Sequence, residues 1–418
     1  MPKIEERPAR QSELSKKLKG VAAPKDQGPV WKGPEVDGIT FSLLSRFLVC
    51  RERFRVLVVK GLKPSPRFSH RMEYGNMWHV CEESFAKNHD WATTTVALRD
   101  YCQGLCQRFP LQQQDVHHWC MVCMAQFPVY VDWWAKHPDV VNRTPLLQEQ
   151  VFSVPYELPS GRTVRLRGKF DSVDLLKDDE GEGIWLQENK SKGEIIEEQV
   201  RQQLRFDLQT MIYLIALGMY KSDKKQAGNS QGYFAKTPIV GVRYNVVRRP
   251  LSGGEGTIVR HKATQGAKCP KCKGSGQIPC KVIPGQATCP KCNGRQRIGG
   301  KPEETLEHFY SRLGGIIQAK PETYFIRWKV EVSTSDVQRF RRECLDPILE
   351  QLCSWWEVIV KGADPFDHAW RSAAIHWRHP FGVYNPLNEG GSSELDEHLA
   401  TGSTAGLTKV DTLFPELQ

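Results

Sequence analysis

The sequence has 418 residues, of which 39% are hydrophobic and 25% are charged. This length can bury a sizeable core and corresponds to about two or three domains, or to one large domain with insertions. No run of about 18 apolar residues is present and the N-terminal segment is polar, which excludes a membrane span, a secretory signal and a secreted disulfide scaffold. We therefore expect a soluble, cytoplasmic protein that does not act at a membrane.

The net charge of +10 is concentrated in one part of the chain. Residues 260–301 contain ten Lys or Arg residues and no acidic residue, so the basic and acidic residues of the remaining chain balance. A basic block of this kind indicates a polyanionic partner such as nucleic acid. The alternative is a solvated lysine-rich loop.

The predicted elements place a group of strands between helices. Residues 1–38 are rich in Pro, Gly, Lys and Glu and predict a disordered basic arm. Helices are expected at 40–57, 73–87 and 94–137, and strands at 146–158, 161–176 and 183–191. One long helix at 194–220, a strand at 238–249, a helix at 303–318, a strand at 323–332 and a helix at 335–360 follow. Residues 386–418 predict a flexible tail.

This order of elements predicts an α/β (α+β) fold with a mixed central sheet flanked by helices. We expect a core in two parts, 39–258 and 302–385, interrupted by an insert at 259–301. No GxxxxGK[ST] phosphate loop occurs, so nothing in the sequence indicates an ATPase.

Two facing carboxylates are predicted in the strands at 161–176 and 183–191. Asp171 lies on the polar face of the first strand, and the turn signal DDEGEG follows at 178–183. A hairpin that pivots between Asp179 and Glu180 places Asp171 opposite Glu188. Facing carboxylates repel unless a cation lies between them, and Mg²⁺ or Mn²⁺ prefers carboxylate oxygen. The alternative is a surface hairpin whose acids and lysines are solvated.

Lys190 projects from the same face of its strand as Glu188, two residues earlier. An acid on one strand and Glu-x-Lys on the next suit phosphodiester hydrolysis, because a metal polarises the phosphoryl oxygen and lowers the pKa of a bound water. The lysine would position that water or stabilise the charge that develops on the phosphate.

Three further motifs accompany the hairpin. The sequence GNMWH places His79 on a helix before the strands, where the alternative is a histidine satisfied within its helix. Gly168 precedes Asp171 by three residues. The predicted helix at 194–220 carries one stripe of polar residues suited to binding a phosphate backbone, which comprises Arg201, Arg205, Gln209 and Tyr213.

In this order, the GxxxH, GxxD, ExK and QxxxY motifs resemble those of the RecB-like branch of the PD-(D/E)XK nuclease superfamily. That branch includes the nuclease domains of RecB and AddB and CRISPR-associated RecB-like exonucleases, and more distantly lambda exonuclease. The resemblance spans about residues 40–360, interrupted by the insert. It implies a restriction-endonuclease-like core and a metal-dependent DNA nuclease that leaves a 5′-phosphate. An exonuclease is favoured, because end-processing enzymes dominate that branch.

The resemblance also implies roles for matching residues. The Mg²⁺ or Mn²⁺ ligands would be His79, Asp171, Glu188 and the carbonyl of Asn189, and the catalytic residues would be Asp171, Glu188 and Lys190. Gln209 and Tyr213 would contact DNA near the scissile phosphate; Arg205 and Arg201 are DNA-contact candidates from the helix stripe alone. Glu149, on the preceding strand, is a further candidate that is equally compatible with a solvated strand residue.

The implied substrate is the end of single- or double-stranded DNA, in repair, recombination or phage DNA processing. No motor is encoded, so the enzyme works unaided or with a separate helicase or recombination protein. One alternative is a catalytically inactive, zinc-containing nucleic-acid-binding or scaffold protein; another is an RNA-directed nuclease. The presence of every motif residue favours catalysis over the inactive alternative.

The sequence departs from relatives that hold an iron–sulfur cluster with one cysteine before the histidine helix and three near the C-terminus. Cys50 matches the first position, but only Cys344 and Cys353 follow the insert, and both fall in a predicted helix. We therefore expect no iron–sulfur cluster, and we expect Cys50 to be a small core residue.

The insert contains two Cys-Pro-Lys-Cys knuckles separated by 16 residues, Cys269/Cys272 and Cys289/Cys292. Two such pairs predict a tetrahedral zinc site made of four cysteines. The CxxCxG spacing is similar to that of the cysteine-rich repeats of DnaJ-type chaperones. Zinc would order a segment with few apolar residues, whose Lys and Arg side chains could then contact nucleic acid. The alternative is a purely structural clip.

A second group of potential ligands lies at 102–123 and comprises Cys102, Cys106, His117, His118, Cys120 and Cys123. Its helical, aromatic-rich surroundings favour core packing over metal binding. We leave this group and Cys280 without a role. The sequence leaves open cleavage polarity, strand preference and oligomeric state.

Overall fold

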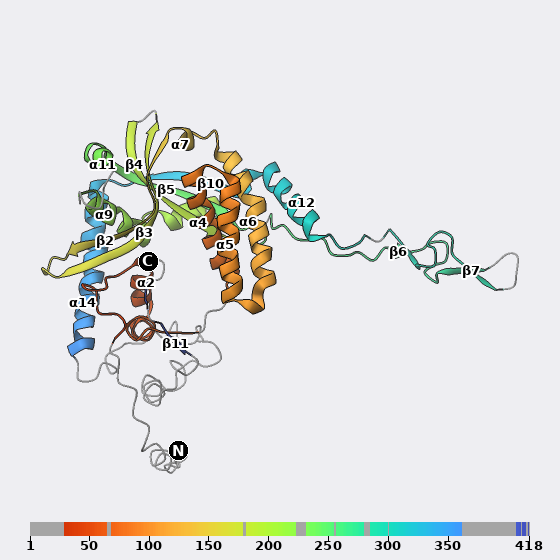
Figure 1. Cartoon of the computed structure of the whole chain (residues 1–418), viewed down its shortest axis with the longest axis horizontal. Coiled ribbons are helices and arrows are strands. Elements are labelled where there is room, and N and C mark those ends of the chain that lie inside the picture. Colours follow the sequence, from red (N-terminus) through yellow and green to blue (C-terminus); the bar gives the residue numbers. More distant parts are fainter. Residues whose placement is uncertain are drawn as a thin grey trace, which may run out of the picture. The chain divides into compact units, whose positions relative to one another are not determined.

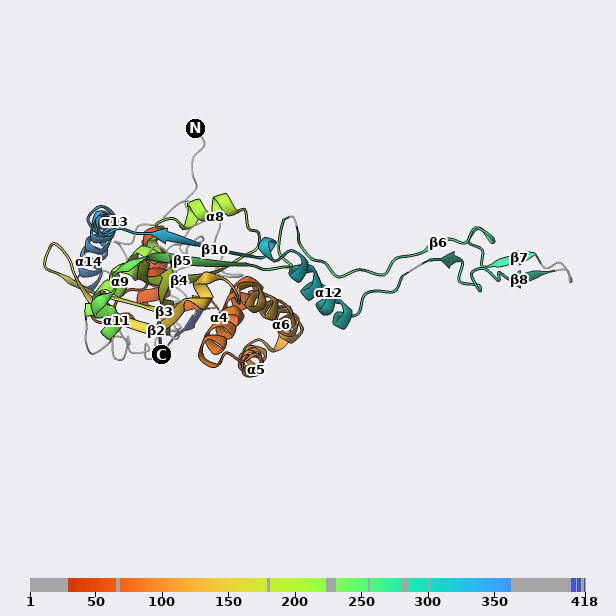
Figure 2. The ribbon, with the colours of Figure 1, turned by 90° about the horizontal axis from the view of Figure 1, so that it is seen from above.

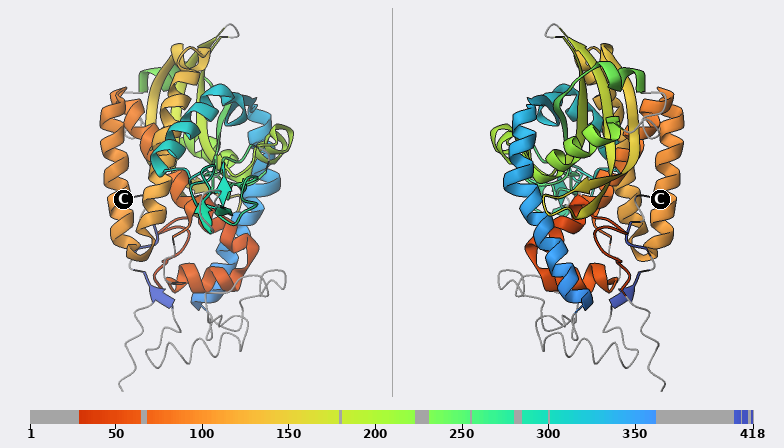
Figure 3. Two further views of the ribbon diagram at one scale, coloured as in Figure 1. Left: turned by 90° about the vertical axis from the view of Figure 1, so that its right-hand side faces the viewer. Right: turned by 90° about the vertical axis from the view of Figure 1, so that its left-hand side faces the viewer.

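The computed structural model describes residues 29–64, 68–178, 181–222, 231–254, 256–279, 285–299, 301–361, 407–410, 412–414 and 417. The chain divides into two units, which Figures 1, 2 and 3 show from different sides. The first unit comprises Met1–Arg67, Val151–Lys169 and Ser335–Gln418, and the second comprises Phe68–Gln150 and Phe170–Thr334.

A mixed five-stranded sheet forms the centre of the fold. Its strands, in the spatial order β10-β5-β4-β3-β2, are Phe325–Glu331, Ile239–Arg248, Gly181–Lys192, Thr163–Asp178 and Arg143–Glu157. β4 is antiparallel to β3 and parallel to β5, and β10 is antiparallel to β5. β2 and β3 contain residues of both units. The predicted α/β fold, with a mixed central sheet flanked by helices, is confirmed (Figure 1).

The β3–β4 hairpin has the register predicted from its turn. The pairs run from Asp178↔Gly181 to Ser172↔Gln187, so Asp171 and Glu188 come directly after the last pair. The predicted alternation is also present, because Val164, Leu166 and Phe170 are buried, whereas Arg165, Arg167 and Asp171 are partly exposed.

Three helices of the second unit pack together: α4 (His70–Asn88), α5 (Trp91–Arg108) and α6 (Gln113–Trp134) (Figures 1 and 2). The side chain of Asp90 caps α5 by accepting the N–H groups of Ala92 and Thr93. Buried aromatic side chains fill the bundle, including Trp78, Phe127 and Tyr130. The short helix α7 (Pro138–Val141) leads into β2, and α12 (Leu306–Ala319) packs against α6.

The single helix predicted at 194–220 is wrong, because the structure has two helices there. α8 (Glu197–Leu204) ends at Arg205, whose backbone is extended, and Phe206 has a φ of 58°. The Asp207 carboxylate then accepts the N–H groups of Gln209 and Thr210 at 2.8 and 3.2 Å and so starts α9 (Leu208–Ser222). α11 (Gln231–Lys236) precedes β5.

In the first unit, helices from both ends of the chain lie side by side (Figure 3). α2 (Phe41–Val49), α3 (Arg51–Phe54) and a π-helical turn (Arg55–Val59) lead to β1 (Leu62–Pro64). α13 (Thr334–Phe340), a second π-helical turn (Arg341–Leu345) and α14 (Asp346–Lys361) occupy the region predicted as one helix. Trp355 of α14 packs edge-on against Phe47 and Phe54.

The predicted disordered arm (1–38) and flexible tail (386–418) each include residues that are folded in the structure. Residues 1–28 and 386–406 lie outside the described residues, but the chain is folded from residue 29. Trp31 is fully buried and packs against Phe54, since an apolar side chain of this size gains free energy by leaving water. Near the C-terminus, β11 (Leu407–Lys409) pairs with β1, and Phe414 is buried.

The segment between β5 and α12 contains two short antiparallel ribbons (Figure 2). β6 (Ala267–Lys268) pairs with β9 (Arg297–Ile298), and β7 (Gln277–Pro279) pairs with β8 (Gln286–Thr288). Among the described residues, no helix has both the length and the apolar character needed to span a membrane.

Candidate active site

A histidine and two acids from three different elements converge in the second unit. His79 lies on α4, Glu149 on β2 and Asp171 on β3. His79 Nδ1 is 3.4 Å from Glu149 Oε1 and 3.9 Å from Asp171 Oδ1. One ligand atom from each residue lies within 4.8 Å of the others, so the three can share one cation.

Glu149 is not a solvated strand residue, which was the alternative that the sequence left open. Its side chain is 5% exposed and its backbone has a φ of 48°, in the left-handed region that residues other than glycine seldom adopt. This conformation interrupts the regular alternation of β2 and turns the carboxylate toward His79. No hydrophobic period in the sequence signals such an irregularity.

Glu188 and Lys190 lie together beside this cluster, on β4. Lys190 Nζ donates hydrogen bonds to Glu188 Oε1 and, at 2.8 Å, to Gln209 Oε1. Gln209 Nε2 also donates to Glu188 Oε1 at 2.7 Å. Glu188 Oε2 is buried and has no hydrogen-bond partner among the described residues. Because an unpaired buried carboxylate oxygen is unfavourable, this atom fits a cation ligand.

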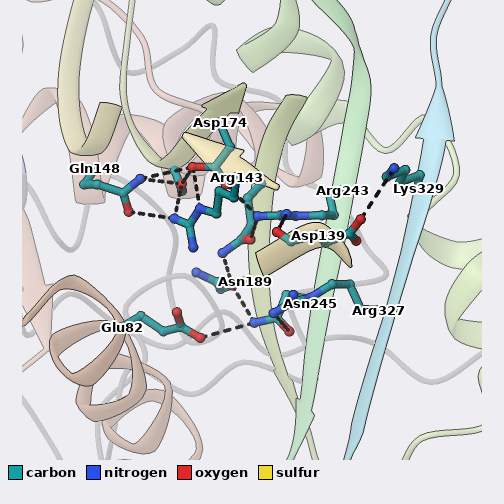
Figure 4. Close-up of polar contacts among 12 residues, drawn as sticks. Glu82, Asp139, Arg143, Gln148, Asp174, Asn189, Arg243, Asn245, Arg327 and Lys329 are labelled. Atoms are coloured by element: carbon teal, nitrogen blue, oxygen red, sulfur yellow. Dashed lines mark hydrogen bonds and ion pairs between the residues drawn. The ribbon is translucent and has the colours of Figure 1, made fainter. Parts of the chain in front are cut away.

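Asn189, between these two residues, joins the cluster to the sheet behind it. Its backbone N–H donates to Asp171 Oδ2 at 2.8 Å. Its side-chain oxygen accepts hydrogen bonds from Gln187 Nε2 at 3.1 Å and from Asn245 Nδ2 at 2.8 Å (Figure 4). These contacts fix the backbone of Asn189 beside Asp171.

The acids of this site are buried, and burial disfavours their ionised forms. Burial raises the pKa of Asp171, although the charge of His79 opposes this. Burial also raises the pKa of Glu188 to about 7, with Asp171 adding to the shift and Lys190 opposing it. For His79, burial favours the neutral form, but Asp171 and Glu149 outweigh it and raise the pKa to about 9. A divalent cation bound to these carboxylates would stabilise their ionised forms.

A cavity of about 310 Å³ opens onto the cluster. Its lining includes residues from α4, β3, β4 and α9, among them Arg71, His79, Asp171, Glu188, Lys190 and Gln209. The absence of a side chain at Gly75 lets α4 approach β4, because a Cβ there would lie 3.2 Å from Ser191 Oγ. The glycine of the GxxxH motif therefore brings His79 to the strands.

The remaining predicted DNA-contacting residues do not line the cavity. Tyr213 is 8% exposed, and its ring packs edge-on against Phe170. Arg201 pairs with Glu197 and lies over the ring of Trp328, and the Arg205 guanidinium lies over the ring of Phe206. Because α8 and α9 are separate helices, the predicted single stripe of these residues is wrong.

The four cysteines of the two knuckles come together in the segment between β5 and α12. Cys269 Sγ is 3.8 Å from Cys289 Sγ, and Cys272 Sγ is 3.6 Å from Cys292 Sγ. All four Sγ atoms lie within 4.8 Å of one another. Thiolates bound tetrahedrally at about 2.3 Å from one zinc ion are about 3.8 Å apart, so this group fits zinc. Gly276, with a φ of 78°, donates its N–H to Cys272 Sγ.

The second cysteine group belongs to the core of the α4–α6 bundle. Cys102, Cys120 and Cys123 are buried there, and Cys123 Sγ lies 3.8 Å from Cys81 Sγ. Cys106 is partly exposed, 3.8 Å from His117 Nε2. His118 Nδ1 lies 2.8 Å from the Tyr310 hydroxyl. Cys50 is buried as predicted, and Cys280 lies outside the described residues.

The mixed sheet and its helices define a restriction-endonuclease-like α/β fold. The family model of the PD-(D/E)XK nuclease superfamily matches residues 39–296, which is more than half of the chain. The chain therefore belongs to the PD-(D/E)XK nuclease superfamily. No curated protein sequence matches it.

Proposed function

We propose that this protein is a metal-dependent deoxyribonuclease, with the convergent acids as its single hydrolytic site. The observation that carries the proposal is the buried, unpartnered Oε2 of Glu188 beside the His79–Glu149–Asp171 cluster. A set of carboxylate and imidazole groups of this kind suits Mg²⁺ or Mn²⁺. Membership of a nuclease superfamily supports phosphodiester hydrolysis as the reaction.

The proposed roles follow from the contacts of each residue. His79, Glu149, Asp171 and Glu188 would hold the metal, with the carbonyl of Asn189 as a further ligand. When bound, the metal would polarise the phosphoryl oxygen and lower the pKa of a coordinated water. Asn189 holds Asp171 through its backbone N–H, and the Gln187 and Asn245 side chains hold Asn189.

Lys190 is the proposed catalytic lysine. Gln209 and Glu188 hold its ammonium group at the edge of the cavity, where it would orient the water or stabilise charge on the phosphate. In the reaction, the water oxygen bonds to phosphorus and the P–O3′ bond breaks. One water proton ends on the departing 3′ oxygen, so the products are a 5′-phosphate and a 3′-hydroxyl. Gln209, whose side chain contacts both Lys190 and Glu188, would position these two residues in addition to the predicted contact with DNA.

The finer assignments rest on the resemblance of the motifs to the RecB-like branch. On that basis we propose an exonuclease that acts on DNA ends in repair, recombination or phage DNA processing, either unaided or with a separate helicase or recombination protein. We also propose that residues 259–301 are a module inserted into a nuclease core of 39–258 and 302–385. Structural zinc on Cys269, Cys272, Cys289 and Cys292 would order this module.

The test is cleavage of end-labelled linear DNA and closed circular DNA, single- and double-stranded, with Mg²⁺, Mn²⁺ or EDTA. We expect metal-dependent loss of linear DNA only. Lys190→Ala and Asp171→Ala should each lower the rate by about 10²-fold or more. The matched control is Lys177→Ala, an exposed lysine on β3 outside the cavity.

Each other outcome contradicts one part of the proposal. Cutting of circles would replace the exonuclease with an endonuclease. Activity retained in the purified Asp171→Ala, Lys190→Ala double variant would overturn the site. Tight DNA binding by the wild-type protein without any cleavage would favour the inactive nucleic-acid-binding protein.

A further inference from the structure

The cavity that holds the acids is also lined by Arg71, an arginine that the proposed chemistry does not use. Arg71 lines it from the first turn of α4, two turns before His79, and is exposed to solvent. Ser191 lines it from β4, directly after Lys190. The first turn of a helix favours anions through its dipole, so Arg71 lies where an anion is already favoured.

Arg249, directly after β5, does not line the cavity but contacts Ser191, which does. Its side chain is 8% exposed, and its guanidinium donates hydrogen bonds to Ser191 O at 3.1 Å and Ser191 Oγ at 3.3 Å. Its Nε atom is buried and has no hydrogen-bond partner in the part of the chain that the structure describes. Within the described residues, neither Arg249 nor Arg71 forms an ion pair with a carboxylate. A buried cation that contacts only neutral groups is unfavourable until an anion approaches it.

Other charges near Arg249 add to the excess of positive charge. Burial lowers the pKa of Arg249, and the charge of Arg71 lowers it further. Burial, Arg249 and Arg71 also lower the pKa of His70, while Asp115 acts on His70 in the opposite direction. Three potential cations, Arg71, Arg249 and His70, thus influence one another, and the acid Asp115 acts on His70.

We propose that Arg71 and Arg249 form a subsite for a second phosphate group of the nucleic-acid strand, beside the phosphate that is cut. This inference rests on the proposed nuclease function and adds to it. Arg71 would contact the phosphate directly, because a guanidinium can donate two parallel hydrogen bonds to phosphate oxygens. Arg249 would act through its buried charge and through its hold on Ser191.

The second phosphate has two possible sources, a terminal 5′-phosphate or an internal phosphate of the strand. A subsite for a terminal phosphate would fix the number of nucleotides between the strand end and the cut. The enzyme would then require a strand end. A subsite for an internal phosphate would hold linear and circular strands equally. The source therefore decides between cleavage from ends and cleavage within the strand.

Binding of labelled oligonucleotides that carry either a 5′-phosphate or a 5′-hydroxyl tests the subsite. Fluorescence anisotropy is measured at fixed salt with Ca²⁺ in place of Mg²⁺, on the full-length wild-type protein, Arg71→Gln and Arg71→Lys. Arg71→Gln should weaken binding about tenfold or more, because it removes charge-assisted hydrogen bonds. Arg71→Lys keeps the charge but not the two parallel hydrogen bonds, so its affinity should lie between those of wild type and Arg71→Gln. Arg99→Gln, an exposed arginine on α5, is the matched control and should bind as wild type.

The two sources give different patterns. A loss in Arg71→Gln that is confined to the 5′-phosphorylated strand supports the terminal phosphate. An equal loss for both strands supports the internal phosphate. If Arg71→Gln binds both strands as tightly as wild type, the subsite does not exist.

Cleavage with Mg²⁺ or Mn²⁺ is measured on the same proteins, so that the two proposals can fail separately. If the wild-type protein does not cleave but its binding depends on Arg71, the subsite is supported and the nuclease function is overturned. If the wild-type protein cleaves with Mg²⁺ but binding and KM are unchanged in Arg71→Gln, the nuclease function is supported and the subsite is overturned.

Discussion

The left-handed backbone of Glu149 is unfavourable for its own strand. A non-glycine residue in this region costs about 1–3 kcal/mol and persists only where the surrounding structure holds it. Here the regular strand on either side keeps the backbone in place, and the carboxylate lies among His79 and Asp171. Such strain is common at functional sites, because it brings together groups that would otherwise repel.

Replacing Glu149 with Gln tests the carboxylate without changing the size of the side chain. We expect the Mn²⁺ concentration for half-maximal cleavage to rise about tenfold or more, since the affinity for a divalent ion depends on the number of charged ligands. A metal titration of cleavage, supported by calorimetry, measures the effect. Glu157→Gln, an exposed acid on the same strand, is the control. An unchanged metal requirement would remove Glu149 from the site.

The pairing of β3, β4 and β5 aligns a row of buried polar side chains behind the site (Figure 4). The register places Gln187 beside both Ser172 and Arg243, and places Asn189 beside Asn245. Asp174 is fully buried, forms an ion pair with Arg143 Nε at 2.9 Å and accepts a hydrogen bond from Arg243 Nη2 at 2.5 Å. A shift of one residue would leave these charges unpaired, so the ion pairs disfavour other registers.

Removal of Asp174 should therefore destabilise the fold strongly. Asp174→Ala leaves the buried Arg243 and the partly buried Arg143 without their common acid, and we expect the free energy of unfolding to fall by about 3–5 kcal/mol. Urea unfolding in EDTA measures this change apart from any effect of metal binding. Asp132→Ala, an exposed acid on α6, should change stability by less than about 0.5 kcal/mol. Similar midpoints for both variants would show that the Asp174 ion pairs contribute little.

In the whole molecule, positive charge and catalytic groups belong to different parts of the chain. The net charge of +10 equals the charge of residues 260–301 alone. The attraction of a polyanion is therefore expected to depend on the insert, and the chemistry on the acids of the sheet. The base of the insert is held by ion pairs of Arg260 with Glu303 and of Arg312 with Glu304.

The double variant Cys269→Ser, Cys289→Ser should lose one zinc ion per chain and bind DNA more weakly. If the insert binds the DNA backbone, the slope of log K against log salt concentration becomes shallower by about 0.9 for each phosphate that the variant no longer neutralises. Elemental analysis and a salt titration of binding measure the two effects, with the partly exposed Cys106→Ser as control. Zinc loss with an unchanged salt slope would show that the insert is only a clip.

Local sequence patterns predicted the features that depend on local geometry. The two-residue period of β3 and the position of its turn determine the hairpin register, in which Asp171 and Glu188 come directly after the last pair, Ser172↔Gln187. The two cysteine knuckles lie close in sequence, so their spacing predicted the convergence of four Sγ atoms. The break at Phe206 escaped prediction because a hydrophobic period continues across it, and only the capping contacts of Asp207 show where α9 begins.

The sequence by itself determined the mixed fold, the hairpin with its acids and lysine, and the cysteine knuckles, because short-range periodicity and spacing encode each of them. Only the tertiary structure decided that Glu149 joins His79 and Asp171, and that Arg71 and Arg249 lie near one cavity. His79 is 70 positions from Glu149, and Arg71 and Arg249 are farther apart still, so their approach depends on how helices pack on the sheet. That packing is set by the buried surfaces of many residues together, which no single motif records.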